Sequence, residues 1–209
     1  MKAVYFTEHG GPEVLQYGDL PEPIPSANEV KIKVRACALN RLDVYTRAGV
    51  RGTKMDLKEP HVLGADVSGE IVEVGSDVTK VSVGDRVVVN PRITCMQCTY
   101  CQSNQSEYCD KAGMVGSGKR GGYAEFAVVP ASSAFPIPTS LSYVQAASLP
   151  TVFMPSWNIL IRRSNLKPWE TALVPSASSG VGTAAIQVAK NVAKSTVITT
   201  TSTPEKANK

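Results

Sequence analysis

The chain has 209 residues, of which 43% are hydrophobic and 19% are charged, and its formal net charge is +4. This composition is ordinary for a globular protein, and the small, dispersed charge argues against a nucleic-acid partner. No apolar run approaches the ~18 residues that a membrane span requires, and the N-terminus lacks the apolar core of a signal peptide. We therefore expect a cytoplasmic protein without a membrane partner.

The first 130 residues have the alternating hydrophobic pattern of short strands. The pattern predicts strands at residues 2–7, 14–17, 29–37, 67–74, 78–81, 86–90 and 121–129. A short helix is predicted from Asn40 to Ala48, ending at Gly49, and residues 52–60 are expected to form a loop. Many short strands at close spacing favour an antiparallel β-barrel.

The pattern changes near residue 139. It predicts helices at 141–148 and 152–163, a strand at 171–174, a helix at 183–191, a strand at 195–201 and a further helix from Pro204. A strand, a turn, a helix and a second strand in this order are typical of the opening of a doubly wound nucleotide-binding fold. We therefore expect a first domain over residues 1–150 and a second over residues 151–209.

Four of the five cysteines lie within fifteen positions, in a lobe that we expect to cover residues 90–112. They are Cys95, Cys98, Cys101 and Cys109. Thiolates at such short spacing can converge on one tetrahedral Zn²⁺, and four of them leave no open position for water. The spacing therefore predicts one structural zinc per chain. Two disulfides or an iron–sulfur cluster are the alternatives.

The turn between the strand at 171–174 and the following helix contains two glycines. It reads Ser178, Ser179, Gly180, Val181 and Gly182. A turn from strand to helix presents backbone N–H groups to a phosphate, and glycines allow the phosphate a close approach. Only two of the three fingerprint glycines are present, so an ordinary turn is the alternative, but the strand–turn–helix–strand context favours a dinucleotide.

The end of the second strand bears on the choice of cofactor. An acidic residue there would bind the ribose 2′-hydroxyl of NAD, and the segment 199–203 has none. Ser202 and Lys206 could instead contact a 2′-phosphate, although Glu205 stands beside Lys206. We therefore expect NADP(H) to be preferred over NAD(H). The alternative is that Lys206 is a solvent-exposed helix residue that does not contact the cofactor.

Several segments together resemble the medium-chain dehydrogenase/reductase superfamily. They are Asn40-Arg41-Leu42-Asp43, His61-Val62-Leu63-Gly64-Ala65-Asp66-Val67-Ser68-Gly69, Val83-Gly84-Asp85-Arg86-Val87, Gly121-Gly122-Tyr123-Ala124-Glu125, the four-cysteine lobe and the glycine turn. The resemblance runs along the whole chain. It implies an α+β GroES-like catalytic domain joined to an α/β Rossmann domain that is incomplete here, with the active site in the cleft between them.

Three positions decide which branch of the superfamily the chain resembles. Asn40, Ala65 and Thr151 stand where its zinc alcohol dehydrogenases carry ligands of a catalytic zinc. None of the three is a nitrogen or sulfur donor of the kind that such a site needs. The resemblance therefore implies a structural zinc without a catalytic one, as in quinone oxidoreductase-like and enoyl reductase-like members. Thr151 is then expected to contact the cofactor.

The resemblance implies an NAD(P)H-dependent oxidoreductase that transfers hydride to an activated C=C bond or a quinone, both small molecules. Asn40 is a candidate hydrogen-bond donor and Tyr45 a candidate hydroxyl donor, while Asp43 orients its neighbours. A loop-capping role for Asn40 and a packing role for Tyr45 are the alternatives. A zinc-dependent alcohol dehydrogenase and a non-catalytic zinc-binding fragment are the other functions considered. Related chains imply that a homo-oligomer is possible.

Overall fold

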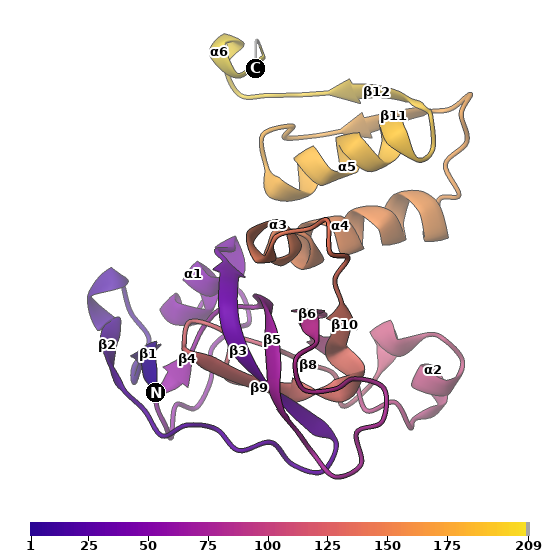
Figure 1. The fold of residues 1–209 in the computed structure, drawn as a ribbon. Helices are drawn as coiled ribbons and strands as arrows, with labels where there is room; N and C mark the ends of the chain where they lie inside the picture. Colours follow the sequence, from indigo (N-terminus) through magenta and orange to yellow (C-terminus); the bar gives the residue numbers. More distant parts are fainter. Residues whose placement is uncertain (208–209) are drawn as a thin grey trace. The chain divides into compact units, whose positions relative to one another are not determined.

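The structure is a computed structural model that describes residues 1–207 (Figure 1). The chain divides into two compact units, Met1–Ser148 and Leu149–Lys209. No helix within the described residues is long and apolar enough to cross a bilayer.

The first unit is built on a five-stranded antiparallel sheet with the order β10-β6-β5-β3-β9 (Figure 1). Its strands are β3 (Glu29–Ala38), β5 (Asp66–Val74), β6 (Arg86–Val89), β9 (Phe126–Pro130) and β10 (Ala134–Pro136). Alternate side chains of these strands point inward, because successive residues of a strand face opposite sides. They form one buried core that includes Val30, Ile32, Val67, Ile71, Val87 and Val129.

A smaller sheet and two helices complete the body of this unit. The sheet has the order β2-β1-β4, with β1 (Lys2–Phe6), β2 (Gln16–Asp19) and β4 (His61–Val62). Helix α1 (Arg41–Ala48) begins after Asn40 and ends at Gly49, which has the left-handed conformation, with φ of 68°, that commonly closes a helix. Helix α3 (Tyr143–Ala147) follows the last strand.

The cysteine lobe contains little regular structure. Strands β7 (Arg92–Ile93) and β8 (Gly113–Met114) pair with each other and bracket helix α2 (Thr99–Gln102). Single 3-10 turns lie at Ser106–Tyr108 in the lobe and at Pro12–Val14 and Ala131–Ser133 elsewhere in the unit.

The second unit has a strand–helix–strand core. Strands β11 (Thr171–Val174) and β12 (Thr196–Thr199) pair in parallel and are connected by helix α5 (Gly180–Asn191). Helix α4 (Pro150–Trp157) continues as a π-helix over Asn158–Arg163, and α6 (Pro204–Ala207) ends the described chain. Proline at the first position of α4 suits a helix start, where its missing N–H is not needed.

Most predicted elements are present, and the exceptions have local causes. Residues 78–81, predicted as a strand, form an irregular segment between turns at 76–77 and 83–84, and Val81 is buried without strand pairing. Residues 121–125, also predicted as strand, pair irregularly, and regular pairing begins only at Phe126. The strand predicted at 14–17 starts at Gln16, because the preceding residues form a 3-10 turn.

Candidate functional site

Four side chains form a polar cluster in the first unit: the half-buried Asn40 and Tyr123 and the buried Asp43 and Asp66. Asp43 is 6% exposed and Asp66 is 1% exposed. One oxygen of Asp43, Oδ2, accepts hydrogen bonds from the Asn40 backbone N–H at 2.7 Å and from the Tyr123 hydroxyl at 2.8 Å. The side-chain amide of Asn40 donates to Asp66 Oδ2 at 2.9 Å. Asn40 therefore connects two buried carboxylates.

Three separate segments bring the polar cluster together. Asn40 and Asp43 are the N-cap and third residue of α1, where an acidic side chain can fold back onto the N-cap N–H. Asp66 begins β5, and Gly64, in the turn before it, donates its N–H to Asp43 Oδ1 at 3.2 Å. Gly64 has φ of 99°, and a Cβ there would lie 2.6 Å from the Tyr123 ring. Only glycine therefore lets this turn approach the tyrosine.

Burial also controls protonation in and beside the polar cluster. Desolvation, and then the charge of Asp43, raise the pKa of the Tyr123 hydroxyl well above its usual value. Burial, followed by the charges of Asp43 and Asp66, raises the pKa of the Cys37 thiol to about 12. Both groups therefore remain protonated at neutral pH, and Tyr123 acts as a hydrogen-bond donor to Asp43.

Two of the three predicted catalytic residues, Asn40 and Asp43, belong to the polar cluster. Tyr45 lies two positions after Asp43 on α1, a spacing that does not place side chains on one helix face, and its ring lies 4.9 Å from the Arg51 guanidinium. The hydroxyl in the cluster belongs to Tyr123, which we did not single out from the sequence. The signal for Tyr123 was its place after the paired glycines of the 121–125 motif. A catalytic role for Tyr45 stays a prediction.

The expected catalytic-zinc positions offer a poor donor set. Ala65 is 1% exposed and its side chain has no atom that could ligate a metal. The side-chain amide nitrogen of Asn40 donates a hydrogen bond to Asp66. Among the described residues, the group of histidines, cysteines or acids that could hold a metal ion is the four-cysteine group.

The four cysteine sulfurs converge on one point in the lobe. The Sγ atoms of Cys95, Cys98, Cys101 and Cys109 all lie within 4.8 Å of one another, and all are free thiols. The Cys95 sulfur is 3.6 Å from that of Cys109 and 3.9 Å from that of Cys101. A tetrahedron with Zn–S bonds of about 2.3 Å requires sulfur separations of about 3.8 Å. The geometry therefore fits a four-coordinate zinc.

The backbone of the lobe prepares one of these sulfurs as a ligand. The N–H groups of Gln97 and Cys98 point at the Cys95 sulfur and lower the pKa of its thiol to about 6. Desolvation raises the pKa of Cys101 to about 11. A metal would bind the first thiolate directly and would displace a proton from Cys101.

The glycine turn of the second unit leads directly into α5. Ser179 is the N-cap, and its Oγ accepts the N–H of Gly182 at 3.0 Å. The helix begins at Gly180, three residues earlier than predicted, so both glycines lie in its first turn. A Cβ on Gly182 would lie 2.3 Å from the Ser176 carbonyl oxygen, so this position requires glycine. Ser178 precedes the N-cap and Val181 is the second residue of α5, and these two complete the predicted phosphate-binding turn.

The other predicted cofactor residues lie at two places in the second unit. Lys206 Nζ donates to Ser202 Oγ at 3.2 Å, just beyond the end of β12. Glu205 is on the same short helix, α6. Thr151 is the second residue of α4. The structure thus brings Ser202 and Lys206 together.

Residues 26–139 match the family described as Alcohol dehydrogenase GroES-like domain. The NAD-dependent alcohol dehydrogenase of Sulfurisphaera tokodaii is 35% identical over 203 residues, 95% of this chain and 58% of that protein. The quinone oxidoreductase of Mus musculus is 34% identical over 191 residues, 91% of this chain and 49% of that protein. The acryloyl-coenzyme A reductase of Metallosphaera sedula is 39% identical over 209 residues, 100% of this chain and 60% of that protein.

A solved structure of similar fold is the cobalt- and zinc-bound thermostable alcohol dehydrogenase from Pyrobaculum aerophilum. It has a TM-score of 0.90 and 34% identity, and the match covers 100% of this chain and 61% of that one. The chain thus spans about half to three fifths of the length of these relatives. The predicted GroES-like, mixed α and β fold class is confirmed. The chain belongs to the alcohol dehydrogenase GroES-like family, within the medium-chain dehydrogenase/reductase superfamily of oxidoreductases.

Proposed function

We propose that the protein reduces activated C=C bonds or quinones with NAD(P)H and carries a structural zinc but no catalytic zinc. The observation that carries this proposal is the pairing of Asn40 with Asp66 beside Ala65, at the positions where a catalytic zinc would need ligands. An alcohol dehydrogenase uses that zinc to stabilise an alkoxide. Reduction of an enone or a quinone spreads charge onto a more distant oxygen, for which hydrogen-bond donors suffice.

The polar cluster supplies rigid positioning in this proposal. A bound nicotinamide cofactor would supply the hydride. Asp66 holds the Asn40 amide in one orientation, and Asp43 fixes the start of α1 by accepting the Asn40 N–H and the Tyr123 hydroxyl. Asn40, which is held by buried partners that cannot rearrange cheaply, and the hydroxyl of Tyr45 would then contact the substrate or the nicotinamide.

The metal and the cofactor follow from separate observations. The four sulfurs fit one structural zinc, which would order the lobe around Cys95 and Cys109. The turn at Ser179–Gly182 would hold a pyrophosphate at the start of α5. The Lys206–Ser202 contact favours a 2′-phosphate and therefore NADP(H), whereas relatives are named as NAD-dependent.

Two other functions compete with this proposal. A zinc-dependent alcohol dehydrogenase is favoured by relatives of that name and by the cobalt- and zinc-bound neighbour. A non-catalytic zinc-binding fragment is consistent with the share of the relatives' length that this chain covers. Reduction of an activated alkene is favoured by the relatives named quinone oxidoreductase and acryloyl-coenzyme A reductase.

An activity assay with metal analysis separates these functions. The protein, extended to the length of its relatives, is assayed with NADPH and NADH on enones, quinones and simple alcohols. We expect reduction of enones or quinones at about one zinc per chain, unaffected by mild chelation. Asn40→Ala should lower kcat/KM by about a hundredfold, the effect of removing one well-placed donor, while the exposed control Asn28→Ala should not. Alcohol oxidation that requires a second zinc would establish the dehydrogenase instead, and turnover by the extended protein with none by the 209-residue chain would favour the fragment.

A further inference from the structure

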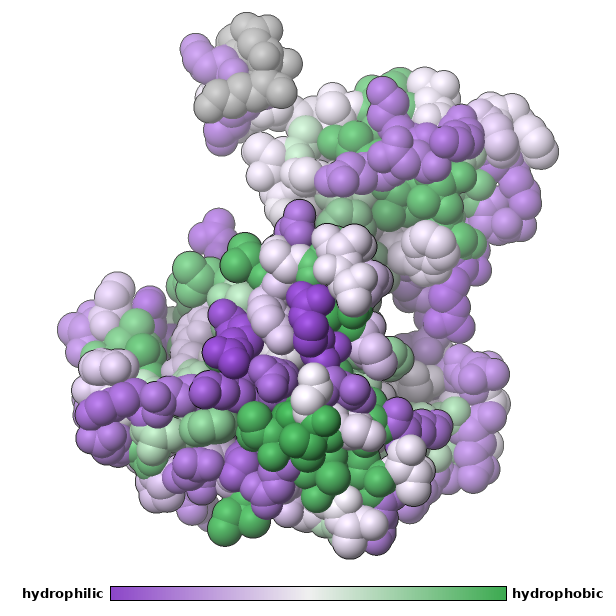
Figure 2. All heavy atoms as spheres, in the orientation of Figure 1, coloured by the Kyte–Doolittle hydropathy of each residue, from purple (hydrophilic) through white to green (hydrophobic). Residues whose placement is uncertain are grey.

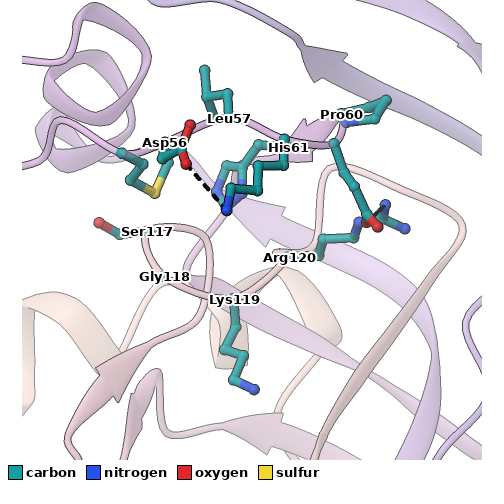
Figure 3. Close-up of a pocket in the computed structure, with 11 residues that line it drawn as sticks. Asp56, Leu57, Pro60, His61, Ser117, Gly118, Lys119 and Arg120 are labelled. Atoms are coloured by element: carbon teal, nitrogen blue, oxygen red, sulfur yellow. Dashed lines mark hydrogen bonds and ion pairs between the residues drawn. The ribbon is translucent and has the colours of Figure 1, made fainter.

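A cavity of about 490 Å³ lies in the first unit, outside the polar cluster and the cysteine lobe (Figure 3). It opens between the segments 55–61 and 117–120. In Figure 3, the turn that carries Lys119 and Arg120 lies opposite the segment that carries Asp56 and Leu57, and the Lys119 side chain is directed away from that segment. Its size is within the usual range for a site that takes a small organic ligand, roughly 300–1,000 Å³.

Hydrogen bonds hold the two walls of this cavity in a fixed relation. His61 Nε2 lies 3.2 Å from the Gly116 carbonyl oxygen, and the Gly121 N–H donates to the Val62 carbonyl oxygen at 2.7 Å. The N–H groups of residues 117–119 all donate to the carbonyl oxygen of Met114, at 3.0 to 3.3 Å. The turn that carries Lys119 and Arg120 is therefore a rigid support.

The lining carries three cations, Lys58, Lys119 and Arg120, and two acids, Asp56 and Glu59. Lys58 lies 3.5 Å from Asp56, and both side chains are at least 80% exposed. Arg120 lies 3.0 Å from Glu59 and is only 36% exposed, whereas Glu59 is 78% exposed. Lys119 makes no ion pair within the described part of the chain.

The ion pairs in the cavity leave its cations available to a ligand. Exposed pairs of this kind contribute little, roughly 0–1 kcal/mol, so an entering anion can displace Glu59 from Arg120. A guanidinium binds phosphate with two parallel hydrogen bonds, which a single carboxylate contact at the surface does not match. The positive charge of Arg120 also reaches the floor of the cavity, where it adds to burial in lowering the pKa of His61.

The cavity shares its supports with the polar cluster. Ser117 in one wall is hydrogen-bonded through its hydroxyl to Thr46 at 3.3 Å, and Thr46 is three residues after Asp43 on α1. The other wall ends at His61, and the same segment reaches Gly64, which donates to Asp43. The walls of the cavity are therefore hydrogen-bonded to the same helix and the same turn that hold the polar cluster.

We propose that this cavity is an anion subsite that holds a phosphate-bearing end of the acceptor substrate through Arg120, with the charge of Lys119 on the same turn adding to the attraction. The inference rests on the proposed function and narrows it. The acceptor is an α,β-unsaturated acyl compound whose carrier bears phosphate groups, since a simple quinone has no anionic group to use this site.

Calorimetric titration of the 209-residue chain tests the subsite, with coenzyme A, pantetheine and inorganic pyrophosphate as probes. We expect coenzyme A to bind at least tenfold more tightly than pantetheine, which lacks its phosphates. Pyrophosphate distinguishes a site for free phosphates from one that also needs the organic part, and it should bind more weakly than coenzyme A. Equal affinities for coenzyme A and pantetheine would overturn the subsite, as would pyrophosphate binding as tightly as coenzyme A.

Charge-matched variants show whether binding occurs in this cavity. Lys119→Gln with Arg120→Gln should weaken coenzyme A binding by about tenfold or more, because charge-assisted hydrogen bonds are lost. Lys33→Gln with Lys80→Gln removes the same charge from exposed positions outside the cavity and should change binding less than twofold. An equal loss in both double variants would overturn the proposal.

A single acid variant gives a gain of affinity that misfolding cannot imitate. Glu59→Gln removes the acid that pairs with Arg120, and it should tighten coenzyme A binding severalfold. Glu8→Gln, at an exposed position outside the cavity, is its control and should have no such effect. Unchanged affinity in Glu59→Gln would count against Arg120 as the phosphate ligand.

The subsite and the proposed function can fail separately. If the extended protein reduces the enoyl thioesters of coenzyme A and of pantetheine with the same KM, the reductase function stands and the subsite is wrong. If it reduces neither, while coenzyme A binding still depends on Lys119 and Arg120, the subsite stands and the proposed function is wrong.

Discussion

At the scale of single residues, Asp43 holds the polar cluster together. Its carboxylate accepts hydrogen bonds from three donors on three segments: the Asn40 N–H, the Gly64 N–H and the Tyr123 hydroxyl. The carboxylate is 6% exposed, so water cannot replace a lost partner. A buried acceptor that satisfies several donors is costly to alter, because each orphaned donor stays desolvated.

Replacing this carboxylate should destabilise the first unit strongly. Asp43→Asn introduces an amide that must turn its N–H₂ toward one of the existing donors, and we expect the free energy of unfolding to fall by about 3 kcal/mol. Urea unfolding measures this change. The exposed Asp77→Asn, whose amide can still accept from Ser76, should change it by less than about 0.5 kcal/mol.

The same measurement on Tyr123→Phe tests whether the two residues act together. If the cluster is one network, the double variant Asp43→Asn with Tyr123→Phe should be less destabilised than the sum of the single variants. Strict additivity would mean that Asp43 is held by something other than the bonds described.

At the scale of elements, the cysteine lobe has too little structure to be stable by itself. Its helix α2 has four residues, and its strands β7 and β8 have two each. Helices and hairpins of this size are not stable in water. The order of the lobe must therefore come from convergence of the four sulfurs, and a metal bound there contributes its binding free energy to folding.

Loss of one thiol should release the metal and disorder the lobe. Purified protein should contain about one zinc per chain, and Cys109→Ser should lose it. Hydrogen exchange should then become fast over residues 92–114, while β3 and β5 keep their protection because they belong to the sheet core. Cys37→Ala is the matched control and should retain the zinc. Zinc retained in Cys109→Ser, or cysteines found as disulfides in the unaltered protein, would contradict the site.

At the scale of the whole molecule, the two units differ in how fully their sheets are covered. The first unit has an eleven-residue apolar core between its strands and the segments that cover them. The second has two strands, and the residues on one face of them remain open: Leu173 is 64% exposed and Ile198 is 55% exposed. Hydrophobic side chains are accordingly visible on the surface of the second unit in Figure 2.

The second unit should therefore be the less stable of the two. A two-stranded sheet with one uncovered face is marginal in water. Amides of β11 and β12 should exchange with solvent at least tenfold faster than those of β3 and β5, as measured by hydrogen exchange and mass spectrometry under native conditions. Equal protection of the two sets of strands would indicate that the exposed face is covered in solution, for example by a second copy of the chain.

Some features of this protein are local, and the sequence alone determined them. The metal group was predictable because its four ligands lie within fifteen residues, so their spacing limits their geometry. The start of α1 was predictable because Asn40 and Asp43 cap the same helix. The strand–turn–helix–strand order of the second unit followed from hydrophobic periodicity, and the superfamily followed from motifs of adjacent residues.

Other features depend on contacts between distant segments, and only the tertiary structure decided them. Tyr123 meets Asp43 across 80 positions, and Asn40 meets Asp66 across 26, because the turn at Gly64 brings β5 against the start of α1. The cavity that places the turn of Lys119 and Arg120 opposite residues 55–61 likewise exists only after the two walls are hydrogen-bonded. The hydrophobic pattern of a sequence indicates on which face of a strand or helix a residue lies. Strand register and backbone turns then decide which side chains from distant segments contact that face.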